Sequence, residues 1–173
     1  MGCLRMKKTL EILNRLVENK VIDNYAIGGA MGAMFYTEAV MTVDLDVFVL
    51  FPDNTDLLPL APLYAYLKEW GYEPDANEHE CVNIEGVPVQ FLPAFDGLLQ
   101  DALANARTFD YQGVPSRVMR AEHLAAICVQ TGRMKDKLRL QTLVESEGFE
   151  ASVFDALLIK FGLSERFGQW AKP

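Results

Sequence analysis

The chain has little cysteine and little histidine. Its 173 residues include three cysteines, Cys3, Cys81 and Cys128, and two histidines. The cysteines lie far apart without Cys-x-x-Cys spacing, which argues against both a zinc site and a disulfide framework. We therefore expect free thiols in a reducing, cytoplasmic compartment. The scarcity of histidine also disfavours metal sites built from histidine and hydrolases of the Ser-His type.

Positive charge and long apolar runs are also lacking. The 16 Lys and Arg residues are outnumbered by 24 Asp and Glu residues, which gives a net charge of −8. This balance argues against a broad, non-specific grip on nucleic acid, so no DNA partner is expected. No apolar stretch reaches the length that spans a membrane, and the N-terminus does not have a signal-peptide core. A membrane partner is therefore not expected either.

The composition is that of a globular protein with a sizeable core. Half of the residues are hydrophobic, and a chain of this length can bury most of its apolar surface without a metal or disulfide. We expect a single domain over residues 1–173, with an α/β core over 1–120 and a helical segment over 121–173.

The residue patterning predicts an α/β (α+β) fold, with a mixed sheet flanked by helices and a C-terminal helical segment. Turn signals at Glu85-Gly86 and Gln112-Gly113 predict two hairpins, and Asp96 is expected to cap a helix. The expected helices are 6–19, 30–39, 57–70, 96–106, 121–131, 135–147 and 150–162. The expected strands are 25–27, 44–51, 79–84 and 87–92, with the second hairpin over 108–119.

Two aspartates interrupt an apolar run in the sequence ValAspLeuAspValPheValLeu, residues 43–50. Burying an unpaired carboxylate costs several kcal/mol or forces it to take up a proton. Side chains alternate along a strand, so Asp44 and Asp46 are expected on one side, about 7 Å apart at Cα, with Leu45 pointing into the core. Two carboxylates so placed can converge on hard divalent ions such as Mg²⁺.

A glycine pair, Gly28-Gly29, lies between the first predicted strand and the helix predicted at 30–39. Glycine lets a ligand approach the backbone, and a helix N-terminus favours anions such as phosphate. A glycine pair alone usually marks a turn, and an exposed Asp-x-Asp is usually solvated. Their occurrence together, in strand–turn–helix–strand order, favours phosphoryl or nucleotidyl transfer. A dinucleotide-binding fold is disfavoured, because the spacing is not GxGxxG and the acids open the second strand.

This stretch resembles the polymerase-beta-type nucleotidyltransferase superfamily. The resemblance is carried by Gly28-Gly29-Ala30 and by Thr42-Val43-Asp44-Leu45-Asp46. A second segment, residues 121–138, is similar to the helical part of small bacterial members that carry a Gly-Arg-x-Lys-Asp motif. That subgroup includes abortive-infection-type toxins of toxin–antitoxin pairs. Together the motifs extend over roughly residues 25–145.

The resemblance implies Mg²⁺-dependent transfer of a nucleoside monophosphate from an NTP to an acceptor. The acceptor would be an RNA such as tRNA, a protein or a small molecule, and a toxin would have an antitoxin partner. Asp44 and Asp46 would hold the metal, and Gly28 and Gly29 would contact the triphosphate. Thr42 belongs to the same motif and is assigned to nucleotide binding.

The family pattern is incomplete in this chain. The family expects a third carboxylate on a later strand, and the matching position is Gln90, which can hydrogen-bond but cannot act as a carboxylate base. Glu85 and Asp96 are close in sequence and are the candidates to replace it. Many active members carry an Arg or Lys immediately before the Thr, where this chain has Met41.

A basic cluster, Arg133, Lys135, Lys137 and Arg139, stands out in this acidic chain. It is either a solvated helix face or a phosphate site in which Arg133 and Lys135 neutralise a triphosphate or acceptor. Asp136 is expected to pair with a neighbouring Arg or Lys.

Three further side chains, His123, Phe35 and Tyr36, have both a functional and a structural interpretation. His123, near a predicted helix start, is interpreted as a cap-region surface residue and not as a base. Phe35 and Tyr36 could stack on a nucleobase, but core packing is the preferred interpretation.

Two other functions stay open at the level of sequence. Gln90 and Met41 motivate a catalytically degenerate nucleotidyltransferase fold that binds a nucleotide or a partner without turnover. An antibiotic nucleotidyltransferase of similar size is the other alternative, because the acidic composition is compatible with an acidic pocket for a cationic drug.

Overall fold

The computed structural model describes residues 2–37, 44–52, 60–73 and 81–170. Within them the chain forms six strands and eight helices. The strands are β1 (Asn24–Ile27), β2 (Leu45–Leu50), β3 (Cys81–Ile84), β4 (Val87–Pro93), β5 (Arg107–Tyr111) and β6 (Val114–Val118). The helices are α1 (Gly2–Glu18), α2 (Gly29–Ala33), α3 (Leu60–Glu69), α4 (Gly97–Ala104), α5 (Ala121–Thr131), α6 (Met134–Val144), α7 (Ala151–Lys160) and α8 (Ser164–Trp170).

The six strands form one mixed sheet in the order β3-β4-β2-β1-β6-β5. β2 is antiparallel to β1 and parallel to β4, and β1 is parallel to β6. β3–β4 and β5–β6 are the two predicted hairpins and form the two edges of the sheet. The predicted α/β class with a mixed sheet is therefore confirmed.

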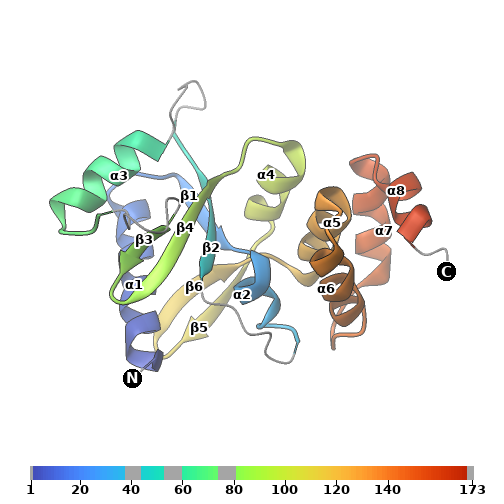
Figure 1. Cartoon of the computed structure of the whole chain (residues 1–173), viewed down its shortest axis with the longest axis horizontal. Coiled ribbons are helices and arrows are strands. Elements are labelled where there is room, and N and C mark those ends of the chain that lie inside the picture. The colour runs from blue at the N-terminus through green and yellow to red at the C-terminus, as the bar shows by residue number, and fades with distance from the viewer. Residues whose placement is uncertain (1, 38–43, 53–59, 74–80, 171–173) are drawn as a thin grey trace.

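Helices cover both faces of this sheet, with α1 and α3 on one side and α2, α4 and α5 on the other (Figure 1). Successive side chains of β2 point to opposite faces of the sheet, so they pack alternately into the two layers. Leu45, Val47 and Val49 are fully buried in the core shared with α1 and α3, as predicted for Leu45. Phe48 packs against the second core, formed with α4 and α5. Asp46, two residues before Phe48, lies on this second face of the sheet.

Both hairpin turns have the backbone that their sequences predict. Glu85 and Gly86 have φ values of 55° and 83°, and Gln112 and Gly113 have 54° and 83°. Positive φ at both central residues is typical of the type I′ turn, whose twist matches that of the flanking strands. The glycine in each pair adopts this conformation without steric cost.

The helix after the glycine pair is shorter than predicted. We expected it over 30–39, but α2 ends at Ala33 and residues 34–36 form a turn; residues 38 and 39 lie outside the described ranges. The helix expected over 96–106 is α4, and Asp96 caps it as predicted by accepting a 2.8 Å hydrogen bond from the Leu99 N–H. The helix α8 was not predicted.

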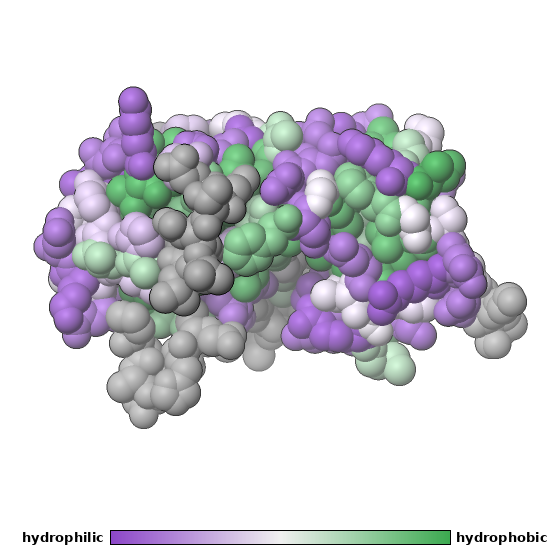
Figure 2. All heavy atoms as spheres, turned by 90° about the horizontal axis from the view of Figure 1, so that it is seen from above, coloured by the Kyte–Doolittle hydropathy of each residue, from purple (hydrophilic) through white to green (hydrophobic). Residues whose placement is uncertain are grey.

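The C-terminal helices pack around α5, whose residues are almost all buried. Phe154, Leu157 and Leu158 of α7 belong to the same core as α5. Figure 2 shows hydrophilic side chains over much of one face of the molecule, with hydrophobic ones among them. In the ranges that the structure describes, no helix is long and apolar enough to cross a membrane.

Candidate active site

The carboxylate of Asp46 lies directly against the glycine turn. A Cβ atom added at Gly29 would overlap the Asp46 carboxylate, and Gly29 has a φ of +56° that side-chain-bearing residues rarely adopt. The Gly28 N–H donates a 2.9 Å hydrogen bond to the backbone carbonyl of Asp46. The two features singled out in the sequence are therefore one structural unit, in which glycine makes room for the acid.

Asp46 sits in a field of opposing charges. Desolvation raises the pKa of its carboxyl group, and the negative charge of Asp44 raises it further. The positive charges of Arg139, Lys135 and Arg133 act in the opposite direction. Asp44 is thus within electrostatic reach of Asp46, and so are the basic residues at the start of α6, which are far from it in sequence. The site brings together an acidic pair and a basic cluster.

The carboxylate oxygens of Asp44 and Asp46 are chemically suited to a hard divalent cation. Mg²⁺ prefers carboxylate oxygens and is commonly bound through one or two carboxylates together with substrate phosphates. Desolvation and the like charge of Asp44 both penalise the ionised form of Asp46, and a cation would relieve both. Among the residues that the structure describes, no group of three or more His, Cys, Asp or Glu side chains could hold a metal. The carboxylates of this acidic pair are therefore of the ligand type that Mg²⁺ prefers.

The strand register places Gln90 beside Asp46. Asp46 on β2 and Gln90 on β4 are paired residues of two parallel strands, so their side chains leave the sheet on the same face. Cys81 on β3 is in turn paired with Gln90. Asp46, Gln90 and Cys81 thus form a row across three strands. The sequence alone did not connect Cys81 with this row, because strand register depends on tertiary pairing.

Neither acid proposed to replace the third carboxylate lies in this row. Glu85 is in the β3–β4 turn, where it accepts a 2.7 Å hydrogen bond from the Tyr72 hydroxyl and pairs with Lys8 at 3.5 Å. Asp96 is occupied as the cap of α4. The expectation that either would complete the acidic site is not supported by these contacts.

The basic residues lie at the start of α6. The fully buried Asp136 carboxylate accepts hydrogen bonds from the Arg133 backbone N–H and side chain, at 3.2 and 2.7 Å. The Arg139 guanidinium is 3.7 Å from the same carboxylate. Asp136 therefore pairs with neighbouring arginines, as predicted, and fixes where their charges lie. Lys135 is exposed and makes no ion pair with any residue in the described ranges.

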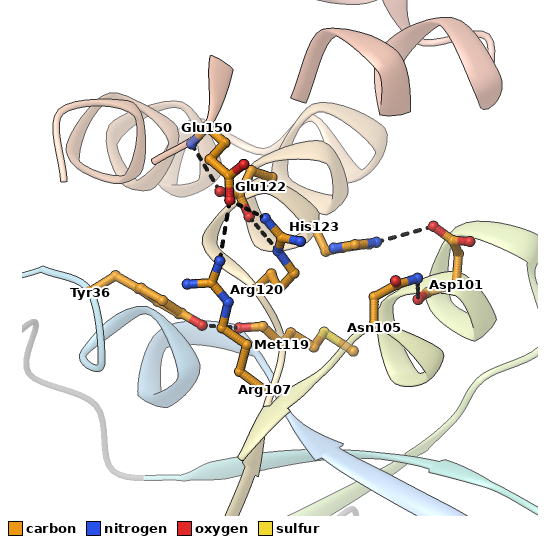
Figure 3. Close-up of polar contacts among 9 residues, drawn as sticks. All are labelled: Tyr36, Asp101, Asn105, Arg107, Met119, Arg120, Glu122, His123 and Glu150. Carbon is orange, nitrogen blue, oxygen red and sulfur yellow. Dashed lines mark hydrogen bonds and ion pairs between the residues drawn. The ribbon is translucent and has the colours of Figure 1, made fainter. Parts of the chain in front are cut away.

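His123 is not the surface residue that the sequence indicated. It is 2 % exposed, and its Nε2 lies 3.1 Å from the Asp101 carboxylate of α4 (Figure 3). Lys160 of α7 binds the other oxygen of Asp101 at 2.7 Å. The Nδ1 atom of His123 is buried, and no described residue offers it a hydrogen bond. The helices α4 and α7 enclose the start of α5, and this tertiary burial is invisible in the local sequence.

A second polar cluster joins α5 to the start of α7 and to β5 (Figure 3). The Glu122 carboxylate is 1 % exposed and accepts hydrogen bonds from Arg120 at 3.0 Å and from the Glu150 N–H at 2.9 Å. The Glu150 side chain pairs with Arg120 at 2.7 Å and with Arg107 at 3.3 Å. Sequence reasoning missed this cluster, which attaches the helical segment to the sheet.

Phe35 and Tyr36 are packed in the fold. Both rings contact Phe109 of β5, with centroids 5.1 and 5.9 Å away. The Tyr36 hydroxyl donates a 2.9 Å hydrogen bond to the Met119 carbonyl (Figure 3). These contacts support core packing and not nucleobase stacking.

A cavity of about 420 Å³ lies on the opposite face of β2, with Leu45, Met31 and Tyr111 in its wall. Leu45 points away from Asp46 along the strand, so the cavity is not part of the acidic site.

Thr42 lies outside the described residues, so its assignment to nucleotide binding stays a prediction. The structure does bring Asp46, Gly28 and Gly29 together, with Gln90 in the adjacent register position. The charge of Arg139 also lowers the pKa of Asp46, but the sequence analysis proposed only Arg133 and Lys135 as phosphate-binding residues. Arg139 lies four residues after Lys135, so the two share a helix face, and this spacing could have indicated its role.

Replacing Gly29 by alanine should lower both stability and activity. The positive φ costs an alanine about 1 kcal/mol or more, and the added methyl group must displace the Asp46 carboxylate. The matched control is Gly113→Ala, at a φ of +83° with open space around it. Thermal unfolding should show a larger loss for Gly29→Ala, and only that variant should lose nucleotide binding. Equal effects of the two changes would contradict the contact between Gly29 and Asp46.

Burial of His123 predicts a loss of stability at mildly acidic pH. Desolvation lowers the pKa of His123 below 6.5, although Asp101 opposes this shift. As the pH falls through 6.5, the unfolded chain takes up a proton that the folded chain resists. Stability should therefore be fully present above that value and fall from pH 7 to pH 5, by at most about 1.4 kcal/mol per pH unit. Denaturant unfolding of His123→Gln should show a shallower pH dependence, and an unchanged profile would contradict the assignment.

Comparison with known proteins identifies the fold. The chain is similar to the solution structure of the antibiotic-resistance factor ANT(2'')-Ia, with a TM-score of 0.54 at 12 % identity, over 95 % of this chain and 94 % of that one. A crystal structure of ANT(2'')-Ia in complex with adenylyl-2''-tobramycin gives a TM-score of 0.55 at 13 % identity, over 96 % and 98 %.

Another neighbour is the crystal structure of an antigenic nucleotidyltransferase-like protein from Paracoccidioides brasiliensis. Its TM-score is 0.55 at 15 % identity, and the match covers 92 % of this chain and 91 % of that one. No model of a protein family matches the sequence, and no curated protein does. The chain therefore has a nucleotidyltransferase-like fold, and this likeness extends over almost its whole length.

Proposed function

We propose that the protein transfers a nucleoside monophosphate from an NTP to an acceptor and needs Mg²⁺ to do so. The observation that carries this proposal is the placement of the Asp46 carboxylate on the Gly28-Gly29 turn, within reach of Asp44 and of the basic start of α6. The nucleotidyltransferase-like fold supports it independently. We treat residues 1–173 as one nucleotidyltransferase-like domain.

The side chains have distinct roles in this proposal. Bound Mg²⁺ would neutralise the triphosphate and favour attack at the α-phosphorus. Asp44 and Asp46 would hold the ion, and Gly29 leaves room for the Asp46 carboxylate and the approaching phosphates. Arg133 and Lys135 would neutralise the charge that develops on the departing pyrophosphate. Positioning and charge neutralisation account for most of the expected rate.

The test is a transfer assay with purified protein. Each of the four α-³²P-labelled NTPs is incubated with Mg²⁺ and with bulk tRNA, protein extract or small-molecule extract, and labelled products are separated. The proposal expects a labelled product and release of pyrophosphate, both abolished by EDTA. Calorimetry of Mg-NTP binding is run in parallel, and absence of both binding and product would overturn the proposal.

A degenerate, binding-only function is the second candidate. It is favoured by the amide of Gln90 in the register position beside Asp46. Under this alternative, calorimetry would detect Mg-NTP binding while no acceptor pool gives a product.

The class of acceptor separates the remaining alternatives. The neighbour solved with adenylyl-2''-tobramycin favours a small molecule over RNA or protein. A toxin role with an antitoxin partner rests on the sequence resemblance of residues 121–138 alone. Its test is co-expression with the product of a neighbouring gene, which should form a stable complex with the protein and relieve growth arrest.

A further inference from the structure

The side chain beside Asp46 cannot remove a proton from an acceptor. Gln90 occupies the paired position on β4, and an amide has no basic group near neutral pH. An attacking hydroxyl normally requires a base, and a positioned base contributes about 10²–10⁴-fold to a rate. An acceptor oxygen that is already ionised does not have this requirement.

Glu85 and His123 do not supply a base at this place. Glu85 is bound to Tyr72 and Lys8 at the hairpin turn. His123 is buried against Asp101 at the start of α5 (Figure 3).

The charges around the site favour an anionic acceptor. Arg133, Lys135 and Arg139 all act on Asp46, and Asp136 pairs with both arginines but carries a single negative charge. A cationic drug would be repelled by this cluster, whereas a second phosphate group would be attracted. The Gln90 amide can also donate hydrogen bonds to an anionic oxygen, which a carboxylate at the same place would repel.

We propose that the acceptor is a phosphomonoester, and that Gln90 binds its phosphoryl group. This inference rests on the proposed nucleotidyl transfer. A phosphoryl oxygen of the acceptor attacks the α-phosphorus of the NTP and forms a new P–O–P bond. The bond between the α-phosphorus and the bridging oxygen breaks, and pyrophosphate leaves with the electron pair. No proton has to be removed, because a phosphomonoester is largely dianionic at pH 7.

The test uses a deproteinised small-molecule extract as the acceptor pool. One half is treated with alkaline phosphatase, the phosphatase is removed, and both halves are incubated with the full chain, Mg²⁺ and the labelled NTPs. Label incorporation should occur in the untreated half and fall at least about tenfold in the treated half. The product should show two coupled ³¹P resonances, which are typical of a P–O–P linkage. Equal incorporation in both halves, or a product with a single phosphodiester resonance, would overturn the inference and leave the nucleotidyl transfer standing.

Variants separate the role of Gln90 from folding effects. Gln90→Glu keeps the side-chain size but adds a negative charge, so incorporation from the untreated extract should fall at least about tenfold. Gln169→Glu on the exposed face of α8 is the matched control and should keep full incorporation. Mg-NTP binding, measured by calorimetry, should be retained in both. Binding without incorporation by the wild-type chain would overturn the phosphomonoester inference, and loss of binding itself would overturn the proposed function.

Discussion

Replacing Asp46 by asparagine should lower the rate of nucleotidyl transfer by about 10³-fold or more, which corresponds to about 4 kcal/mol of transition-state stabilisation. The asparagine keeps the shape that packs on Gly29 but loses the charge that would bind a divalent cation. The change also removes the half-buried carboxylate whose pKa is raised by desolvation and by Asp44. The folded protein should therefore be at least as stable as the wild type. Rates are measured with labelled NTP, and stability by denaturant unfolding.

The matched control for this variant is Asp155→Asn, on the exposed surface of α7. It removes the same charge from the chain and should leave the rate unchanged. If Asp46→Asn retains more than about a tenth of the wild-type rate, the carboxylate does not hold an essential cation, and the proposed role of Asp46 is wrong.

Replacing Glu122 by alanine should lower the free energy of unfolding by about 3 kcal/mol, because it removes one partner of a buried ion pair. Glu122 is 1 % exposed. Its loss leaves the Glu150 N–H and part of the Arg120 guanidinium without their acceptor. Since this cluster attaches α7 to α5, the effect should be far larger than that of a surface change. Thermal and denaturant unfolding provide the measurement.

Glu147→Ala, at an exposed position in the turn before α7, is the control and should change stability by less than about 0.5 kcal/mol. Glu122→Gln retains the size of the side chain and should lose less stability than Glu122→Ala. Similar, small effects of all three changes would show that the Arg120–Glu122–Glu150 cluster does not stabilise the fold.

Local signals predicted the elements of this fold better than their arrangement. Glu85-Gly86 and Gln112-Gly113 marked both hairpins, because positive φ at a two-residue turn is a local property. The pairing of β2 with β4 brings together residues far apart in the chain, and no local pattern specifies it. The position of Gln90 beside Asp46 was expected only from the family resemblance.

The prediction for His123 was wrong because it used the helix start alone. Its neighbours Arg120 and Glu122 are charged. In the structure these charges pair with each other and with Glu150, while α4 and α7 cover the histidine. Polar residues at a helix start can therefore be buried when their partners come from other elements, and a single sequence does not reveal those partners.

The glycine turn and the acidic pair could be recognised from the sequence because each breaks a local rule. A carboxylate in an apolar strand and a glycine pair at a helix start are both costly without a function. What the sequence could not supply was the reason for Gly29, namely the Asp46 carboxylate packed against it. The basic residues of α6 reach the same place only through the packing of the C-terminal helices.

The central claim is that Asp46 and Asp44 hold a divalent cation beside the glycine turn. It is tested most directly by a crystal structure with Mn²⁺ and a non-hydrolysable NTP, using the anomalous signal of manganese. We expect a manganese peak bonded to the Asp46 carboxylate, with the triphosphate between Gly28-Gly29 and the start of α6. A nucleotide bound elsewhere, or bound here without metal on Asp46, would contradict the claim.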